Sequence, residues 1–235
     1  MKKHLIPICL LLTSAGATNA YAQSPVQMSI GANIQPANWE GDNKNGGTSF
    51  DAKGGQLRLD LRLSKARFYS GLSFQGGEFD FDDGAPDKIF NAAPAERLDK
   101  VTIERGEFDW VFGYYFWPQV SLFVDLKSIT NDWKGERYSV NYTGLGVGVT
   151  GFNPINEHWI LFGSLGFVKL NIESSGDEIG DGRGSAFQIG GLYKINDKAN
   201  ITISLKTQHN VYEFDDNSEQ EHDIGGLVFG FNVTP

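Results

Sequence analysis

Residues 107–130, EFDWVFGYYFWPQVSLFVDLKSIT, decide the fold. In the first half of this stretch every second residue is aromatic: Phe108, Trp110, Phe112, Tyr114 and Phe116. After Trp117-Pro118-Gln119 the alternation resumes with Val120, Leu122, Val124 and Leu126. A period of two residues is the signal of a β-strand. A short break that contains proline between two such runs predicts a hairpin.

The polarity of this hairpin is unusual for a soluble sheet. One face is a continuous aromatic and aliphatic row, whereas the other face mixes glycine and serine with the charges of Glu107, Asp109 and Asp125. A strand of a membrane barrel has this pattern, because its apolar side meets lipid and its polar side meets a narrow lumen. We therefore expect the hairpin to face a membrane.

The N-terminus has the features of a secretory signal peptide. Lys2 and Lys3 precede a short apolar run at 5–12, and Ala20-Tyr21-Ala22 is a small-x-small cleavage site. Such a run is too short for a membrane helix. We predict a signal peptide at 1–22 and one exported domain at 23–235. Cys9 is the one cysteine of the sequence, so the exported domain depends on sheet closure and packing rather than on disulfides.

Composition excludes some partners and folds. The formal net charge is −9, and no basic patch is present to neutralise phosphates, so we expect no nucleic acid partner. No stretch after the signal peptide approaches the roughly 18 consecutive apolar residues of a helical membrane span. Two classes remain, a soluble secreted protein and a β-barrel, which is the only all-β structure that satisfies its backbone in a bilayer.

Ten runs of alternating polarity follow the signal peptide. Their predicted bounds are 26–34, 56–64, 68–81, 100–117, 120–130, 137–149, 159–172, 185–195, 200–214 and 222–233. Short connections alternate with generally longer, acidic ones, which is typical of a membrane barrel with short turns at one rim and long loops at the other. We predict an all-β, transmembrane, antiparallel meander β-barrel of ten strands. We predict a bulge at Gly76-Gly77 that bends the run at 68–81. Merging or splitting of runs at Gly76-Gly77 or at 144–148 would make the number eight or twelve.

With this pattern, residues 26–235 resemble the small bacterial outer-membrane β-barrel proteins. The resemblance implies a location in the bacterial outer membrane, with lipid and lipopolysaccharide around the barrel. It also implies insertion by the barrel-assembly machinery, with both termini at the periplasmic rim. That family usually ends its last strand with a terminal aromatic residue. Here Phe229 and Phe231 keep the alternation, but the chain continues to Pro235.

Charged residues of both signs fall on the predicted inward faces. We expect them to form ion pairs across the lumen or between neighbouring strands, since a buried charge is costly unless it is paired. They could fill the lumen as a polar plug or line a narrow passive pore. The predicted lumen residues are Arg58, Asp60, Arg62, Glu107, Asp109, Asp125, Lys127, Lys194 and Lys206.

Aromatic residues cluster near the predicted strand ends. Such residues form girdles at the two membrane interfaces of a barrel. At the periplasmic rim the predicted girdle contains Phe116, Trp117, Trp159 and Tyr193. At the outer rim it contains Trp39, Trp133, Tyr142 and Tyr212.

Catalytic and metal-binding motifs are weak. His209 and Asp223 could form a His/Asp pair near the outer rim, close to acids such as Asp82 and Asp83, and such a pair can activate water. However, there is no Gly-x-Ser-x-Gly sequence, and the residue two after His209 is Val211 rather than serine. No acidic loop matches a twelve-residue calcium loop.

We therefore expect a non-enzymatic outer-membrane barrel with a structural or interaction role, or a narrow passive pore, without metal or cofactor. An outer-membrane hydrolase with a rim His/Asp site and a soluble secreted β-barrel binder are the alternatives.

Overall fold

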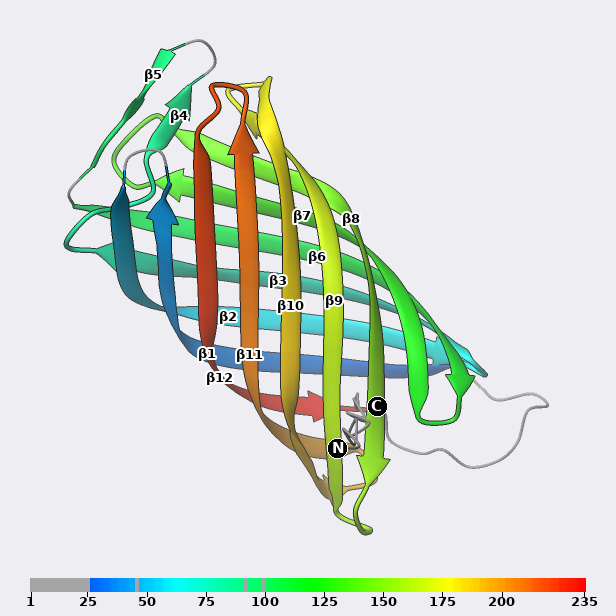
Figure 1. Ribbon diagram of the computed structural model, residues 1–235. Coiled ribbons are helices and arrows are strands. Elements are labelled where there is room, and N and C mark those ends of the chain that lie inside the picture. Colours follow the sequence, from blue (N-terminus) through cyan, green and yellow to red (C-terminus); the bar gives the residue numbers. More distant parts are fainter. Residues whose placement is uncertain (1–25, 45–46, 91–92, 99) are drawn as a thin grey trace, which may run out of the picture.

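The computed structural model describes residues 26–235 apart from 45–46, 91–92 and 99, so the predicted signal peptide lies outside the described residues. Among these residues ten long strands form one closed antiparallel barrel, and two short strands form a separate hairpin (Figure 1). No helix in the described part of the chain is long and apolar enough to cross a membrane. The barrel strands are β1 (Gln27–Asn43), β2 (Thr48–Lys65), β3 (Phe68–Phe81), β6 (Val101–Trp117), β7 (Val120–Trp133), β8 (Ser139–Pro154), β9 (Trp159–Ser174), β10 (Asp177–Asn196), β11 (Ala199–Phe214) and β12 (Glu219–Val233).

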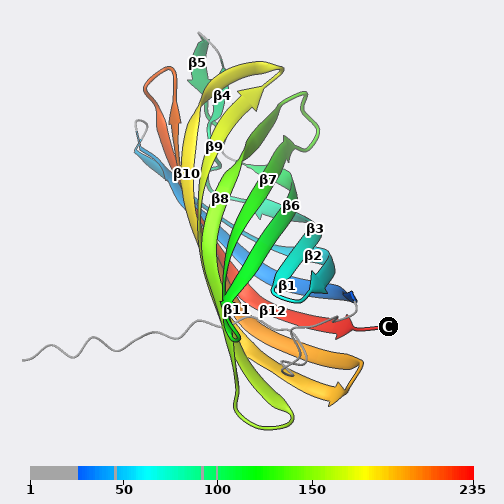
Figure 2. The same ribbon diagram turned by 90° about the vertical axis from the view of Figure 1, so that its right-hand side faces the viewer.

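Each barrel strand pairs with the next along the chain, and β1 pairs with β12 to close the barrel. The short strands β4 (Lys88–Phe90) and β5 (Ala93–Glu96) form a hairpin between β3 and β6. Figure 2 shows this hairpin above one end of the barrel, with the C-terminus away from it. We call the end that carries the β4–β5 hairpin the hairpin rim. The end where β1 begins and β12 finishes is the terminal rim.

The prediction of a ten-stranded antiparallel barrel is confirmed, but most strands reach further toward the hairpin rim than predicted. The loop predicted at 36–55 is β1 up to Asn43 and β2 from Thr48. The loop predicted at 173–184 is the end of β9, a two-residue turn at 175–176 and the first part of β10. In both segments the outward alternation of apolar residues has stopped, so the sequence pattern there is typical of a loop although the strands continue.

The predicted bulge at Gly76-Gly77 is wrong. Both glycines are paired in continuous register with β2 and β6. A Cβ added to Gly77 would lie 2.0 Å from the carbonyl oxygen of Gly55, so glycine is needed there for close strand packing rather than for a bulge.

The outward face is apolar on the half of the barrel next to the terminal rim. We call these exposed apolar residues the apolar belt. Each strand contributes to it, and β2 alone supplies Leu57, Leu59 and Leu63. The belt includes Ile30, Ile34, Phe74, Trp110, Phe112, Leu122, Val124, Leu145, Val147, Phe167, Ile189, Ile203, Leu205, Leu227 and Phe229. Such a belt is the surface that a barrel presents to lipid.

Polarity inverts toward the hairpin rim. On β2 the outward positions that precede Leu57, toward the hairpin rim, are Gly55, Lys53 and Asp51, and all three are exposed. The inward positions change in the opposite direction, from Arg58 to the buried residues Ala52 and Phe50. The part of the barrel near the hairpin rim is therefore built like a soluble protein, with charges outside and an apolar core inside.

This inner core fills the barrel near the hairpin rim, and we call it the apolar plug. Trp39 lies at its centre, with its ring edge-to-face against Phe79 (centroids 5.1 Å apart) and against Phe81 (5.4 Å apart). Edge-to-face aromatic pairs add about 0.5–1.5 kcal/mol each beyond the burial of their area. Glycine makes room for these rings: a Cβ on Gly54 would lie 2.7 Å from the Phe79 ring. The plug also contains Phe50, Ile103, Ile129, Trp133, Tyr142, Leu170, Ile172, Tyr212, Phe214 and Ile224.

The plug corrects the predicted outer girdle. Trp39, Trp133, Tyr142 and Tyr212 lie inside the barrel, and Trp39 is 0% exposed. The two-residue period explains the error, because Trp39 is an odd number of residues from the outward Ile34 and must face inward. An aromatic residue near a strand end indicates a girdle only when its parity is outward.

The aromatic residues predicted for the other girdle lie at the terminal rim. Trp117 is 64% exposed, and Trp159 and Tyr193 are also exposed. Phe116 is half-buried, and its ring lies 4.7 Å from that of Trp117. A register irregularity between Tyr115 and Trp117 shifts the phase of β6 there. Their role at a membrane interface remains a prediction.

Candidate functional site

A network of ion pairs crosses the lumen between the apolar plug and the terminal rim. Asp109 of β6 lies directly opposite Lys127 of β7, so the register itself places the two charges together. Lys127 Nζ contacts Asp109 and lies 2.6 Å from Glu107 Oε1. Arg58 of β2 binds Asp60 (Nε to Oδ1, 2.7 Å) and approaches Asp109 (Nη1 to Oδ2, 3.9 Å). Pairing of this kind offsets the cost of burying the charges.

Residues of β11 connect this network to the opposite wall. Lys206 Nζ donates to Gln75 Oε1 of β3 at 3.2 Å, and Gln208 Nε2 donates to Glu107 Oε1 of β6 at 3.3 Å. Strand β11 is not a neighbour of β3 or β6 in the barrel. These bonds therefore cross the lumen and hold its far walls together.

The remaining predicted lumen residues lie around this network. Arg62 donates to the Tyr115 hydroxyl at 2.7 Å and lies over the Tyr69 ring, 4.1 Å from its centroid. Asp125 lines a cavity beside Lys127. Lys194 also lies at an inward position of its strand. Its cross-strand neighbour is Asn200 near the terminal rim, away from the network. The sequence did not predict Arg105 as a lumen residue, but it is buried beside the plug residue Trp39, and its Nη2 lies 3.5 Å from Glu107 Oε2.

Two small cavities flank the network. One, of about 250 Å³, is lined by Arg58, Asp60 and Arg62 and reaches Asn200 and Thr234 at the terminal rim. The other, of about 200 Å³, is lined by Glu107, Asp109, Asp125 and Lys127. Arg58 and Lys206 are among the residues that line both cavities. The two cavities thus adjoin each other beside the ion-pair network.

A short segment also covers the hairpin rim. We call residues 85–90 the rim segment. Asn43 Nδ2 donates to the carbonyl of Ala85 at 3.1 Å, and Gln220 Nε2 donates to the carbonyl of Asp87 at 2.8 Å. The Tyr138 hydroxyl both accepts from the Ile89 N–H (2.7 Å) and donates to its carbonyl (2.9 Å). Ala85 and Ile89 are buried in the apolar plug. Three separate strand ends therefore hold the rim segment over the mouth of the barrel.

The electrostatics of the rim segment favour the same closed arrangement. Lys88 is buried, contacts Glu136 and lies 3.4 Å from Glu96. Burial lowers the pKa of Lys88, but the hydrogen bond and charge of Glu136, with the charge of Glu96, raise this pKa above its ordinary value. Burial raises the pKa of the Tyr138 phenol, because burial disfavours its charged form. Both groups are thus kept in their protonated forms, which make these contacts.

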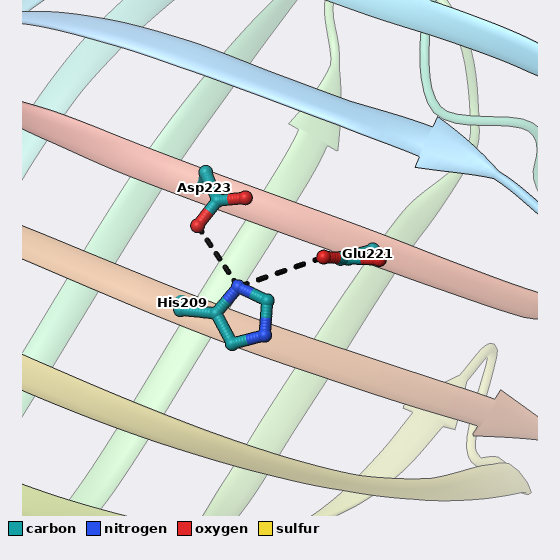
Figure 3. Close-up of side chains that lie close together, drawn as sticks. All are labelled: His209, Glu221 and Asp223. Carbon is teal, nitrogen blue, oxygen red and sulfur yellow. Dashed lines mark hydrogen bonds and ion pairs between the residues drawn. The ribbon is translucent and has the colours of Figure 1, made fainter.

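A second group of side chains lies on the outward face near the hairpin rim. His209 of β11 lies directly opposite Asp223 of β12, and its Nδ1 is 2.9 Å from Asp223 Oδ1 (Figure 3). Glu221, two residues before Asp223 on the same face, brings Oε1 to 3.9 Å from the same nitrogen. The structure thus brings together the His/Asp pair considered from the sequence. Glu221 was missed, although its two-residue spacing from Asp223 was a usable signal.

The rest of the hypothetical hydrolase site is incomplete. Asp82, predicted near this pair, forms an ion pair with Lys100 instead, at 2.8 Å. Ser185 of β10 lies opposite His209 in the register, but within the described part of the chain no hydrogen bond joins the two side chains. The position two after His209 is Val211, which carries no nucleophile. The pair has a base and an orienting acid without a bonded nucleophile.

Comparison with known proteins gives the fold but no close relative. No protein-family model matches the sequence, and no curated protein matches it. The outer membrane protease OmpT from Escherichia coli is similar in structure, with 10% sequence identity and a TM-score of 0.56, over 92% of this chain and 100% of that chain. The translocator domain of autotransporter NalP from Neisseria meningitidis matches with 8% identity and a TM-score of 0.47, over 91% of this chain and 90% of that chain.

Identities this low carry fold and not activity. Together with the apolar belt, the fold supports the predicted outer-membrane location. The chain resembles the bacterial outer-membrane β-barrel proteins in fold.

Proposed function

We propose that this protein is a non-enzymatic, non-conducting barrel of the outer membrane that has a structural or interaction role. The observation that carries the proposal is the apolar plug, which fills the barrel near the hairpin rim. Ions and polar solutes cross a barrel through a hydrated path lined by polar groups. Rings such as Trp39, Tyr142 and Tyr212, all fully buried, occupy this part of the lumen in place of polar groups that could line such a path.

Two further features support closure. The rim segment is hydrogen-bonded over the mouth. Below the plug, Lys127 and Arg58 are engaged by Glu107, Asp109 and Asp60 rather than free to bind a passing solute. The charges of the lumen therefore serve as a polar filling. This favours a filled lumen over the narrow passive pore.

The parts left for contact with other molecules are the two outward surfaces. The apolar belt contacts membrane lipid, and the charged surface near the hairpin rim lies at the level of lipid headgroups and lipopolysaccharide or beyond it. We assign the interaction role to this charged surface. Insertion by the barrel-assembly machinery belongs to the same proposal.

Electrical conductance in planar lipid bilayers tests the proposal. The wild-type barrel should give no stable current steps, whereas a known porin in the same bilayer gives them. A variant that shortens the plug, Trp39→Ala with Tyr212→Ala, serves as the matched comparison and should show more current than the wild type. Regular steps from the wild-type barrel, unchanged in the variant, would mean that solutes pass by another route and that the proposal is wrong.

A rim hydrolase is the second candidate, and the 2.9 Å contact between His209 and Asp223 is the observation that favours it. If that pair is a general base, lipid or peptide turnover by the purified barrel should fall at least about 100-fold in His209→Ala. Ser185→Ala should abolish turnover if its hydroxyl is the nucleophile. Turnover that is absent in the wild type, or unchanged in His209→Ala, removes this candidate.

A further inference from the structure

We propose that His209, Glu221 and Asp223 form a binding site for a divalent transition-metal cation, with zinc as the best-fitting ion, on the outward face of the barrel (Figure 3). The site goes beyond the structural role proposed above, and it does not depend on that role. It lies on β11 and β12, where the outward residues have changed from apolar to charged.

The three donor atoms already converge. His209 Nδ1, one oxygen of Glu221 and one oxygen of Asp223 all lie within 4.8 Å of one another. The imidazole nitrogen is 2.9 Å from Asp223 and 3.9 Å from Glu221. Zinc binds imidazole and carboxylate at about 2.0–2.2 Å, which places neighbouring tetrahedral ligands about 3.4 Å apart. Rotations of the two carboxylates that move their oxygens by less than about 1 Å would meet this geometry.

The backbone holds these donors in place. His209 and Asp223 are a directly opposed pair in the β11–β12 ladder, and Glu221 is two residues from Asp223 on the same face. All three therefore project from the same side of two paired strands rather than from loops. Sites on regular strands are positioned more precisely than sites on loops.

A second and independent observation is the repulsion that surrounds the donors. Strand β1 places Glu40 directly opposite Asp223, and Asp42 directly opposite Glu221. Like charges opposite each other destabilise a sheet. The Glu40–Asp223 pair next to His209 is thus a local cost that a divalent cation would reduce.

The nearby lysine meets this need for only one of the two acid pairs, Asp42–Glu221. Lys44 Nζ binds Glu221 Oε2 at 2.5 Å and approaches Asp42 at 3.6 Å. It thereby fixes the Glu221 carboxylate from the far side and leaves Oε1 facing His209. An imidazole donor favours zinc and similar metals, whereas calcium and magnesium prefer all-oxygen sites. The donor set therefore selects a transition metal rather than the hard cations.

Isothermal titration calorimetry tests the proposal, with zinc chloride added to the full barrel in detergent and a phosphate-free buffer. We expect one saturable site in the wild type, and a loss of affinity of about 10- to 100-fold or more in His209→Ala and in Asp223→Asn. His158→Ala is the matched control, because His158 is exposed at the terminal rim and should leave zinc affinity unchanged. Cobalt added in place of zinc should give visible absorption bands in the wild type that His209→Ala lacks.

Because His209 and Asp223 are at least partly exposed, both variants should fold, and heat-dependent gel migration checks this. The absence of saturable zinc binding in the wild type would overturn the proposal. Equal zinc affinity in the wild type and in folded His209→Ala would also overturn it. So would calcium binding as tight as zinc binding and independent of His209, because the site would then be an acidic surface without selectivity.

Discussion

The inversion of polarity along the barrel can be tested with one substitution at two heights of the same strand face. Phe112 and Thr102 both point outward from β6, ten positions apart in the chain. Phe112 belongs to the apolar belt, whereas Thr102 donates to Asp80 near the hairpin rim, at 2.6 Å. Arginine at Phe112 should destabilise the barrel in lipid, and arginine at Thr102 should not.

The expected size follows from the position of Phe112 in the belt. On β6 the outward apolar residues run from Phe108 to Tyr114, a distance of about 20 Å along a strand at about 3.4 Å per residue. The middle of this run is near Val111, so Phe112 lies about 3 Å from it along the strand. An arginine close to the middle of the bilayer costs about 2–4 kcal/mol in a membrane barrel, and the cost falls to about 0–1 near the interfaces.

The assay is reversible denaturant unfolding of the barrel in lipid vesicles, which gives the free energy of unfolding for each variant. Phe112→Arg should lose about 2–4 kcal/mol. Thr102→Arg should stay within about 0.5 kcal/mol of the wild type, since it adds a cation beside Asp80 on a hydrated surface. Equal effects at the two positions, or no effect at Phe112, would refute the assignment of the apolar belt to lipid and of the charged surface near the hairpin rim to water.

Three further predictions concern the lumen, the plug and the rim segment. Lys127→Met should lower the free energy of unfolding by about 3–5 kcal/mol, because it leaves Glu107 buried without its closest cation. Adding Glu107→Gln to this variant should restore part of the loss. Strictly additive losses of the two single variants would contradict a direct pair. Trp39→Ala should cost about 3–5 kcal/mol in the same assay, and a cost below 1 would mean that the plug is loosely packed. The pKa of Tyr138 is raised in the folded state. The contribution of Tyr138 to the free energy of unfolding should therefore be constant below about pH 10 and fall as pH rises further. Unfolding curves of wild type and Tyr138→Phe at pH 8 and 11 measure this, and a wild-type advantage that grows with pH would contradict the sign.

Much of the barrel could be predicted because one physical signal, outward apolar alternation, marks each lipid-facing strand. That signal located the turn between β6 and β7 at Trp117-Pro118-Gln119, and it matched the bounds of β3. The apolar alternation ends where the strand extends beyond the apolar belt. Beyond Ile34 the outward positions of β1 become polar, and Gly, Asn and Asp accumulate, so the remaining strand was assigned to a loop. Closure of the barrel sustains these polar strands, and composition alone does not contain that information.

The candidate sites show the same limit. Asp109 and Lys127 were predicted as lumen residues because parity is visible in the sequence, but their direct pairing depends on the register between β6 and β7. The aromatic residues of the plug were misplaced because clustering at strand ends was given more weight than parity. The rim segment could not be predicted, because its contacts with Asn43, Tyr138 and Gln220 join distant parts of the chain.

Closure of the lumen is most directly tested by thiol labelling from each side of the membrane. Cys9 is the one cysteine of the sequence and lies in the predicted signal peptide, so a single cysteine can be introduced without background. Thr202→Cys places it in the cavity that reaches the terminal rim. In vesicles of one orientation, a membrane-impermeant maleimide should label it from the terminal-rim side and not from the hairpin-rim side, whereas Asp216→Cys, exposed at the hairpin rim, should show the reverse. Labelling of Thr202→Cys from both sides at similar rates would mean that the apolar plug does not close the barrel.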